Sequence, residues 1–390
     1  MKTVKDLDLE NKKVIIRCDF NVPIVDGKIV DDTRMVESLK TIQYCLDHHC
    51  KVILMSHLGR VKEEAELAKN DLAPVAAHLS ELLHKEVLFS KKTRGQELEE
   101  MISRMEAGDV LLVQNTRYED LDGKKESSND EELGTYWASL GEVFINDAFG
   151  TAHRAHASNV GIASHLPSAV GFLIEKELTA LSVLDNPPHP FVVILGGAKV
   201  ADKIGVIENL VGKADKILIG GGMSYTFLKA QGYEIGKSLF DEESLDFCKR
   251  VLKEHGDKIV LPVDYAVTNE FTNDEEYRLK DAKEIAADEM GLDIGEKTTM
   301  MFEDILKEAA IAIWNGPLGV YEFEKYKKNT VRLLEFAVEN NIKIILGGGD
   351  IVAAATAAGY KEKVYHASTG GGATLEYLEG KGLPGIEAIH

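Results

Sequence analysis

Arginine and histidine residues recur at one kind of position in the first half of the sequence, just after short apolar runs. The four runs are Val14–Ile16, Val52–Met55, Val110–Val113 and Val143–Ile145. The basic residues that follow them are Arg17, His57, Arg60, Arg117, His153, Arg154 and His156, and Arg34 lies in the loop segment after the first run. One such arginine could be an ordinary surface charge, but a guanidinium group also binds carboxylate and phosphate oxygens bidentately. The recurrence after four successive runs predicts a cationic basin that holds a small anion.

Glycines take the same position in the second half. The runs Phe191–Leu195, Ile217–Ile219, Ile311–Trp314 and Ile344–Leu346 are followed by GGAK, GGG, NGP and GGGD, and a further TGGG spans residues 369–372. Two of these turns open the predicted helices Ile351–Ala358 and Ala373–Leu378. Glycine lets the backbone approach a ligand closely, and a helix N-terminus offers free N–H groups to phosphate. A single Gly-Gly pair could be a tight turn, but five such turns predict a nucleotide site.

Three charged residues stand beside these glycines. Lys199 and Lys203 are four residues apart, a spacing that puts both on one face of a helix, where they could reach phosphates or face solvent. Asp350 follows the fourth glycine turn and could hold Mg²⁺ or act as a helix N-cap. The P-loop pattern and the dinucleotide fingerprint are absent, and no general base stands out. Phosphoryl transfer fits this set, because it needs mainly positioning and charge neutralisation.

The apolar runs indicate the elements that must position these residues. They are continuously apolar, which is typical of parallel strands buried on both faces, and a ninth run is Ile259–Val263. Helical patterns such as Thr33–Leu46 and Leu72–Leu83 fill the gaps between them. Alternating strands and helices predict parallel sheets, and ligands bind beyond the carboxyl ends of such strands. With 390 residues the chain is long enough for two domains.

A helical pattern over Phe172–Leu184 separates the two halves, and Asn186-Pro187-Pro188 ends it. It is interpreted as a linker helix, with a packing helix of one large sheet as the alternative.

Composition excludes several classes of function. The net charge of −20, from 45 basic and 65 acidic residues, argues against broad binding to nucleic acid or to an anionic membrane. No run of about 18 apolar residues predicts a membrane span, and the first residues lack the apolar core of a secretory signal. Cys18, Cys45, Cys50 and Cys248 form no CxxC pair and indicate reduced cytoplasmic thiols. The cluster His48-His49-Cys50 could suggest a metal, but a polar helix end is favoured because no partner pair has zinc spacing.

In order along the chain, the motifs resemble those of phosphoglycerate kinase. They are RCDFNVP (Arg17–Pro23), DDTR (Asp31–Arg34), SHLGR (Ser56–Arg60), NTRYE (Asn115–Glu119), NDAFGTAHRAH (Asn146–His156), GGAKVADKI (Gly196–Ile204), GGGM (Gly220–Met223), GLDIG (Gly291–Gly295), WNGPLGVYE (Trp314–Glu322), GGGD (Gly347–Asp350) and STGGGATLE (Ser368–Glu376). The resemblance covers essentially the whole chain. It implies a glycolytic phosphotransferase that converts 1,3-bisphosphoglycerate and ADP to 3-phosphoglycerate and ATP with Mg²⁺.

The resemblance also implies roles for individual residues. The implied 3-phosphoglycerate site consists of Asp19, Asn21, Arg34, His57, Arg60, Arg117 and Arg154. The implied nucleotide site consists of Gly197, Lys203, Gly221, Gly222, Leu239, Gly291, Leu292, Pro317, Val320, Glu322 near the ribose, Gly348, Gly349, Asp350 and Ile351. The implied catalytic residues are Arg34, Lys199, Lys203, Gly371 and Gly372, and Asp350 is expected to hold the magnesium. One departure is Ile351, where the family usually has Ser or Thr, whose hydroxyl could cap the helix or touch a phosphate; the backbone N–H remains.

The implied fold is two Rossmann-like αβα domains, each with a parallel sheet, joined by a linker helix and a hinge. The expected divisions are a substrate domain over 1–170, a linker over 171–185, a nucleotide domain over 186–375, and a tail over 376–390 that returns to the first domain. The family implies a cytoplasmic monomer that closes about its hinge. Two other functions remain open from the residues alone: a non-catalytic nucleotide sensor, and a kinase acting on another carboxylate.

Overall fold

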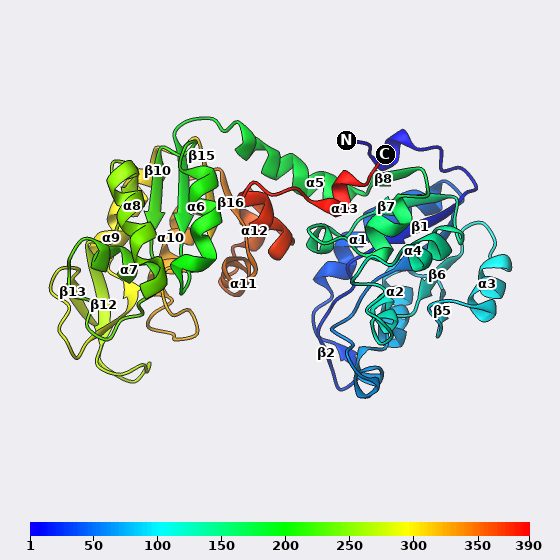
Figure 1. Cartoon of the computed structure of the whole chain (residues 1–390), viewed down its shortest axis with the longest axis horizontal. Helices are drawn as coiled ribbons and strands as arrows, with labels where there is room; N and C mark the ends of the chain where they lie inside the picture. The colour runs from blue at the N-terminus through cyan, green and yellow to red at the C-terminus, as the bar shows by residue number, and fades with distance from the viewer. The chain divides into compact units, whose positions relative to one another are not determined.

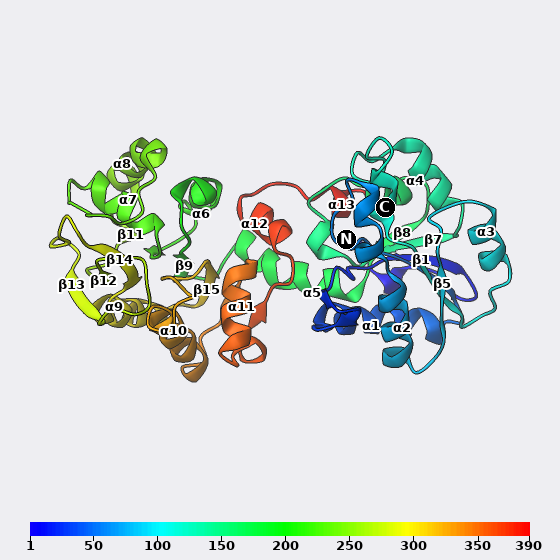
Figure 2. The same cartoon turned by 90° about the horizontal axis from the view of Figure 1, so that it is seen from below.

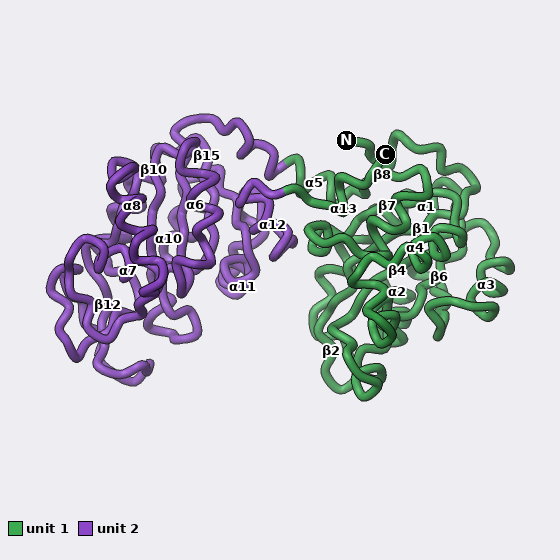
Figure 3. Tube along the Cα trace, in the orientation of Figure 1, with its two compact units in different colours: residues 1–179, 382–390 green, residues 180–381 purple.

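The structure, a computed structural model, describes all residues from Met1 to His390. The chain forms two compact units, shown in Figure 3. Unit 1 comprises Met1–Thr179 together with Gly382–His390, and unit 2 comprises Ala180–Lys381. The chain therefore begins and ends in the same unit, and one division falls inside helix α5 (Phe172–Leu181).

Unit 1, where Figure 1 marks both ends of the chain, is built on a six-stranded parallel sheet with the order β5-β6-β4-β1-β7-β8. Its strands are β1 (Lys13–Arg17), β4 (Lys51–Met55), β5 (Val87–Ser90), β6 (Val110–Val113), β7 (Val143–Asn146) and β8 (Ser168–Val170). Its helices are α1 (Thr33–Asp47), α2 (Ala73–Leu83), α3 (Gln96–Ser103), α4 (Glu131–Ala138), most of α5, and α13 (Pro384–Glu387). A short hairpin, β2 (Ile24–Val25) and β3 (Lys28–Ile29), follows β1.

Alternate side chains of the central strand β1 enter two different apolar clusters. Val14 and Ile16 pack with Ile42 of α1 and Leu79 of α2. Ile15, between them, packs instead with Leu98 of α3 and Trp137 of α4, among others. Both faces of the sheet are thus buried under helices, which explains why the strand sequences are continuously apolar.

Unit 2 repeats this plan with the order β11-β10-β9-β15-β16-β17, again all parallel. The strands are β9 (Phe191–Leu195), β10 (Lys216–Ile219), β11 (Ile259–Val260), β15 (Ile311–Asn315), β16 (Ile344–Leu346) and β17 (His366–Ala367). The helices are α6 (Ile204–Leu210), α7 (Met223–Ala230), α8 (Leu245–His255), α9 (Glu296–Lys307), α10 (Lys328–Glu339), α11 (Gly349–Ala357) and α12 (Gly372–Leu378). Figure 2 shows α6 and α8 on one side of this sheet and α10 and α11 on the other.

A second, antiparallel sheet of three strands is present in unit 2. Its order is β13-β12-β14, with β12 at Asp264–Thr268, β13 at Arg278–Asp281 and β14 at Met290–Ile294. Tyr265, Val267 and Ile294 belong to the same apolar cluster as strands β9 and β15, so this sheet extends the main core.

The predicted fold class is confirmed: the chain has two α/β units, each built on a parallel sheet. All nine apolar runs coincide with strands, although only Ile259–Val260 of the run Ile259–Val263 forms one. The strands β5, β8 and β17 and the antiparallel sheet were not predicted. His48 is the C-cap residue of α1, so the segment His48-His49-Cys50 does lie at a helix end. No helix has the length and apolar character needed to cross a membrane.

Two local expectations were wrong, and one of the two alternatives for Asp350 is excluded. Arg34 is the second residue of α1 and does not lie in a loop. Lys199 and Lys203 do not share a helical face, because Lys199 has an extended backbone and Val200–Lys203 is a 3₁₀ turn ahead of α6. Asp350 is not an N-cap, because Gly348 occupies that position of α11 and Asp350 lies within the first helical turn.

Candidate functional site

Three of the predicted substrate residues in unit 1 are tied together by hydrogen bonds. The guanidinium of Arg34 donates through Nη1 to the Asn21 carbonyl at 2.9 Å and lies 3.4 Å from Asp19 Oδ1. Asp19 Oδ1 also accepts from the Asn21 amide at 3.1 Å, and Asn21 Oδ1 accepts from Gly59 N at 2.9 Å. The ends of β1 and β4 and the start of α1 thereby meet in one polar cluster.

Arg117 joins this cluster through the backbone of Gly59. Its Nη1 donates to the Gly59 carbonyl, while Asn115 beside it accepts from the Leu58 and Arg117 amides at 3.1 and 3.0 Å. The Asn115 amide nitrogen donates to the Leu58 and Asn70 carbonyls at 2.7 and 2.9 Å. Fully buried Asn115 therefore fixes the loop that follows β4, a role that was not assigned from its NTRYE motif.

A cavity of about 690 Å³ lies beside these loops in unit 1. Three of the predicted substrate residues line it, namely Arg60, Arg117 and Arg154. Lys62 and Lys124 add two further cations that were not singled out, and Asp120 is the one acidic residue of the lining. Its excess of positive charge suits a small multivalent anion.

The predicted residue His57 is almost fully buried at 5% exposure. Its Nδ1 lies 3.1 Å from Nη2 of Arg17, which is itself completely buried at the end of β1. Burial, reinforced by the charges of Arg17, Arg117 and Arg34, holds the pKa of His57 well below its usual range. Burial likewise lowers the pKa of His156 to about 4. Both rings are neutral at pH 7, so the positive charge of the basin comes from its arginines and lysines.

In unit 2 the glycine turns after neighbouring strands touch one another through their backbones. Gly197 N donates to the Pro317 carbonyl at 3.0 Å, and Gly221 N donates to the Leu318 carbonyl at 3.0 Å. A Cβ on Gly221 would lie 2.6 Å from Gly197 N, and the residue has a φ of +64°. Only glycine allows this approach, so the turns after β9, β10 and β15 form one continuous backbone surface.

Lys203 connects this surface to the start of α11. Its Nζ donates to Oδ1 of Asn315, whose amide nitrogen donates in turn to the Gly347 carbonyl. Burial lowers the pKa of Lys203, while the charges of Asp202 and Asp350 act in the opposite direction. Gly348 and Gly349 then open α11, whose first N–H groups are free for an anion. Asn315 was missed from the sequence, although it opens the Asn315-Gly316-Pro317 turn.

A second cavity, of about 350 Å³, lies next to the glycine turns. Six of the predicted nucleotide residues line it, namely Gly221, Gly222, Leu239, Gly291, Leu292 and Val320. Phe271, Tyr225 and Met290 complete a largely apolar wall. Apolar and aromatic walls of this kind suit a planar base.

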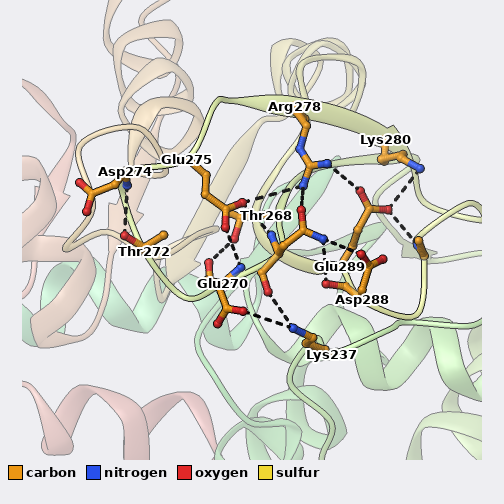
Figure 4. A network of polar contacts seen from close by, with 12 residues as sticks. Lys237, Thr268, Glu270, Thr272, Asp274, Glu275, Arg278, Lys280, Asp288 and Glu289 are labelled. Atoms are coloured by element: carbon orange, nitrogen blue, oxygen red, sulfur yellow. Dashed lines mark hydrogen bonds and ion pairs between the residues drawn. The ribbon is translucent and has the colours of Figure 1, made fainter.

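The loop that carries Phe271 is braced by the polar network of Figure 4. Arg278 and Lys280 of β13 point toward the buried carboxylate of Glu289, at 3.4 and 3.2 Å. Arg278 Nη2 also donates to Asn269 Oδ1 at 2.7 Å, and Lys237 Nζ donates to the Asn269 carbonyl at 2.9 Å. The loop is thus held through both the side chain and the backbone carbonyl of Asn269, which lies two residues before Phe271.

The remaining predicted residues are less closely connected. Lys199 and Glu322 are exposed and line neither cavity. Gly371, with a φ of +51°, is the N-cap of α12, and Gly372 is its first residue. Ile351 is fully buried in the apolar cluster of unit 2, which explains an apolar residue there and leaves only its backbone N–H for a ligand.

Asp350 at the start of α11 suits a magnesium ion that is held jointly by a carboxylate and by phosphate oxygens. Asp350 is exposed in the first turn of α11, and no group of three or more His, Cys, Asp or Glu side chains could hold a metal ion. Mg²⁺ commonly binds through one or two carboxylates together with substrate phosphates. A single carboxylate beside the free N–H groups of a helix N-terminus meets that requirement.

Comparisons with known proteins agree over the whole length of the chain. Residues 4–381 match the family model described as phosphoglycerate kinase. Phosphoglycerate kinases of Listeria innocua and Staphylococcus aureus are 58% and 57% identical, covering 100% of this chain and 98% and 99% of those proteins. The phosphoglycerate kinase structure from Coxiella burnetii has a TM-score of 0.90 at 37% identity, covering 99% of this chain and 98% of that one. The structure from Pyrococcus horikoshii OT3 has a TM-score of 0.85 at 31% identity, covering 100% and 98%.

Proposed function

The chain belongs to the phosphoglycerate kinase family, and we propose that the residues described above transfer a phosphoryl group reversibly from 1,3-bisphosphoglycerate to ADP. The products are 3-phosphoglycerate and ATP, as in glycolysis. The assignment of one ligand to each unit rests on a difference between their residues. Unit 1 offers a basin rich in arginine, and unit 2 offers glycine turns beside an apolar cavity.

We assign the phosphoglycerate to unit 1. Arg60, Arg117 and Arg154 line the cationic cavity and suit the phosphate that stays on the substrate. Asp19, Asn21 and Arg34 form one hydrogen-bonded cluster and suit the hydroxyl and carboxyl end. His57 contributes a neutral ring in their midst.

We assign the nucleotide to unit 2. The base occupies the cavity lined by Leu239, Gly291 and Leu292, and Glu322 faces the ribose. The phosphates run along the turns of Gly197 and Gly221 toward Lys203 and the N-terminus of α11. Asp350 would hold the Mg²⁺ of the nucleotide, which when bound neutralises phosphate charge.

The transfer itself needs aligned reactants and stabilised charge rather than an acid or a base. We assign the phosphoryl group in flight to Arg34, Lys199 and Lys203, with backbone N–H groups of Gly371 and Gly372. Arg34 belongs to unit 1 and the others to unit 2, and we propose that hinge closure unites the two ligands and excludes water. We also propose, from membership of the family alone, that the protein is a cytoplasmic monomer.

One coupled assay tests the reaction and the magnesium ligand together. ATP formation from 1,3-bisphosphoglycerate and ADP is measured across a magnesium titration, for the wild type and for Asp350→Asn. We expect magnesium-dependent turnover, and a half-saturating magnesium concentration several-fold higher in the variant. Asp202→Asn is the matched control, because Asp202 is also an exposed acid near Lys203.

The outcomes separate the two claims. Turnover with another acyl phosphate but not with 1,3-bisphosphoglycerate would refute the substrate. Magnesium titrations that coincide for the wild type and Asp350→Asn would remove Asp350 from the metal site while leaving the reaction intact.

A further inference from the structure

Arg17 differs from every other arginine of the basin because it is completely buried. Arg60 and Arg154 are exposed and Arg117 is partly exposed, and all three line the cavity. Arg17 has no exposed surface, whereas His57 keeps a small exposed fraction, so the guanidinium of Arg17 is not placed to touch a ligand. A buried charge is costly unless its hydrogen bonds are made within the protein, so its contacts should reveal its role.

The guanidinium of Arg17 has three partners. Nε donates to Ser158 Oγ at 2.8 Å, and Nη1 donates to the Cys18 carbonyl at 2.5 Å. Nη2 lies 3.1 Å from Nδ1 of His57. A guanidinium has only donors, so Nδ1 of His57 must be the acceptor in this last pair and cannot carry a proton.

A neutral imidazole has one protonated nitrogen, which for His57 is therefore Nε2. Nε2 makes no hydrogen bond within the protein. His57 is more than nine-tenths buried and stands among Arg17, Arg34 and Arg117, whose positive charges disfavour a second proton on the ring. The ring thus keeps one unused donor.

We propose that Arg17 is a positioning residue that holds His57 in its Nε2–H tautomer, so that the ring donates a hydrogen bond to an anionic oxygen of the phosphoglycerate. The inference deepens the proposed function and rests on its assignment of the substrate to unit 1. The other tautomer would present a lone pair to the same oxygen, and the contact would change from attraction to repulsion.

A further pair of residues orients Arg17. Glu126 is fully buried, and its carboxylate accepts from Ser158 N at 2.8 Å and from Ser158 Oγ at 2.7 Å. The single hydroxyl proton of Ser158 is committed to Glu126, so its oxygen is left to accept from Arg17 Nε. Glu126, Ser158, Arg17 and His57 thus form a chain of hydrogen bonds whose directions are fixed. Ser158 donates to Glu126, and Arg17 donates to Ser158 and to His57.

The first test determines the tautomer of His57 in the wild-type protein. The protein is labelled with ¹⁵N-histidine, and the ring signals of His57 are assigned by their absence in His57→Ala. We expect the pattern of the Nε2–H tautomer at pH 7, with Nδ1 unprotonated. An Nδ1-protonated ring, an averaged mixture or an imidazolium pattern would overturn the proposal.

The second test removes the positioning group. In Arg17→Met the Nδ1-protonated form of His57 should appear, and the KM for 3-phosphoglycerate should rise about tenfold or more, with kcat within about twofold. Arg104→Met is the matched control, because Arg104 is an exposed arginine of unit 1 outside the cavity and also removes one charge. Arg17→Lys keeps the buried cation beside Glu126 and serves where the methionine variant does not fold.

A double-mutant cycle distinguishes positioning from direct contact. If Arg17 acts only through His57, then Arg17→Met adds little to the KM increase already caused by His57→Ala. Additive effects would show that Arg17 meets the substrate directly and would overturn the inference. Failure of the proposed function looks different, because then His57→Ala leaves the KM for 3-phosphoglycerate unchanged.

Discussion

The two lysines after β9 differ in their surroundings, and that difference predicts different roles. Lys203 is partly buried and hydrogen-bonded to Asn315, whereas Lys199 is exposed and free of such a partner. We expect Lys203→Ala to weaken ADP binding by roughly 10- to 100-fold, because a charged hydrogen bond contributes about 1.5–3 kcal/mol. Lys199→Ala should leave the ADP affinity near that of the wild type and lower kcat instead.

Titration calorimetry with ADP and steady-state rates measure these two effects separately. Equal losses of affinity in both variants would contradict the distinction. Wild-type affinity in Lys203→Ala would remove Lys203 from the nucleotide site.

Arg34 has a position that suits the transition state more than the ground state. It lies in the first turn of α1, its side chain is 42% exposed, and its one bonded nitrogen is directed to Asn21 and Asp19. The other nitrogens of its guanidinium group therefore remain free to bind the negative charge that develops during transfer. We expect Arg34→Ala to lower kcat by roughly 10²- to 10³-fold with a much smaller rise in KM. Arg104→Ala is the control for charge, and an unchanged kcat in Arg34→Ala would exclude the catalytic role.

Residue types in the sequence predicted the kind of ligand that each unit binds, but not which of these residues are buried. The recurrence of arginine after strands predicted the basin, and Arg60, Arg117 and Arg154 do line one cavity. The same pattern could not separate Arg17, because burial depends on neighbours such as Ser158 and Glu126 that are far away in sequence. Asn115 and Asn315 were missed for a similar reason, since they act through backbone groups that only the fold brings to them.

At the scale of elements, the first amides of helix α5 donate to the buried carboxyl group of Asp147, whose protonation depends on pH. Asp147 Oδ1 accepts from the Leu173 and Ile174 amides at 2.9 and 3.4 Å, and Thr41 Oγ1 accepts from the Phe172 amide at 3.0 Å. Burial is the main cause that raises the pKa of Asp147 to about 7, against an ordinary value of 3.8. A carboxyl with a raised pKa in the folded state binds its proton more tightly there than in the unfolded chain.

The sign of the pH dependence follows from that shift. The contribution of Asp147 to stability is fully present below pH 3.8 and is lost as the pH rises to about 7. Asp147→Asn cannot titrate, so its free energy of unfolding relative to the wild type should increase between pH 5 and pH 8, by up to a few kcal/mol. Denaturant unfolding of both proteins across this range measures it. A difference that stays constant with pH would contradict the assignment.

The elements that the sequence failed to predict share a physical cause. The strands β5, β8 and β17 are edge strands or short ones, and β5 has two partly exposed residues among its four. β8 and β17 have only three and two residues, so neither is long enough to show the continuous apolar run that revealed the central strands. β13, with the sequence RLKD and alternating exposure, belongs to an antiparallel sheet and is equally hidden. Central strands were found because both of their faces are buried.

At the scale of the whole molecule, each unit has its own core and its own reporter. The chain has two tryptophans, with Trp137 buried in α4 of unit 1 and Trp314 buried in β15 of unit 2. Their indole N–H groups donate to the Thr93 and Gly316 carbonyls, both at 2.8 Å and within the same unit. Trp137→Phe and Trp314→Phe therefore give two proteins in which fluorescence follows the unfolding of one unit at a time.

The tail Gly382–His390 belongs to unit 1, although all of unit 2 lies between it and the rest of unit 1 in the sequence. Gly385 N donates to the Ala152 carbonyl at 2.9 Å, Asn146 Nδ2 donates to the Gly385 carbonyl at 3.0 Å, and His390 N donates to Ser168 Oγ at 3.0 Å. Removing residues 382–390 leaves buried Asn146 without this partner, so we expect unit 1 to lose on the order of a few kcal/mol. The Trp137 transition should move to lower denaturant while the Trp314 transition stays near that of the full chain. An equal shift of both transitions would contradict separate cores, and no shift of either would mean that the tail contributes nothing to the stability of unit 1.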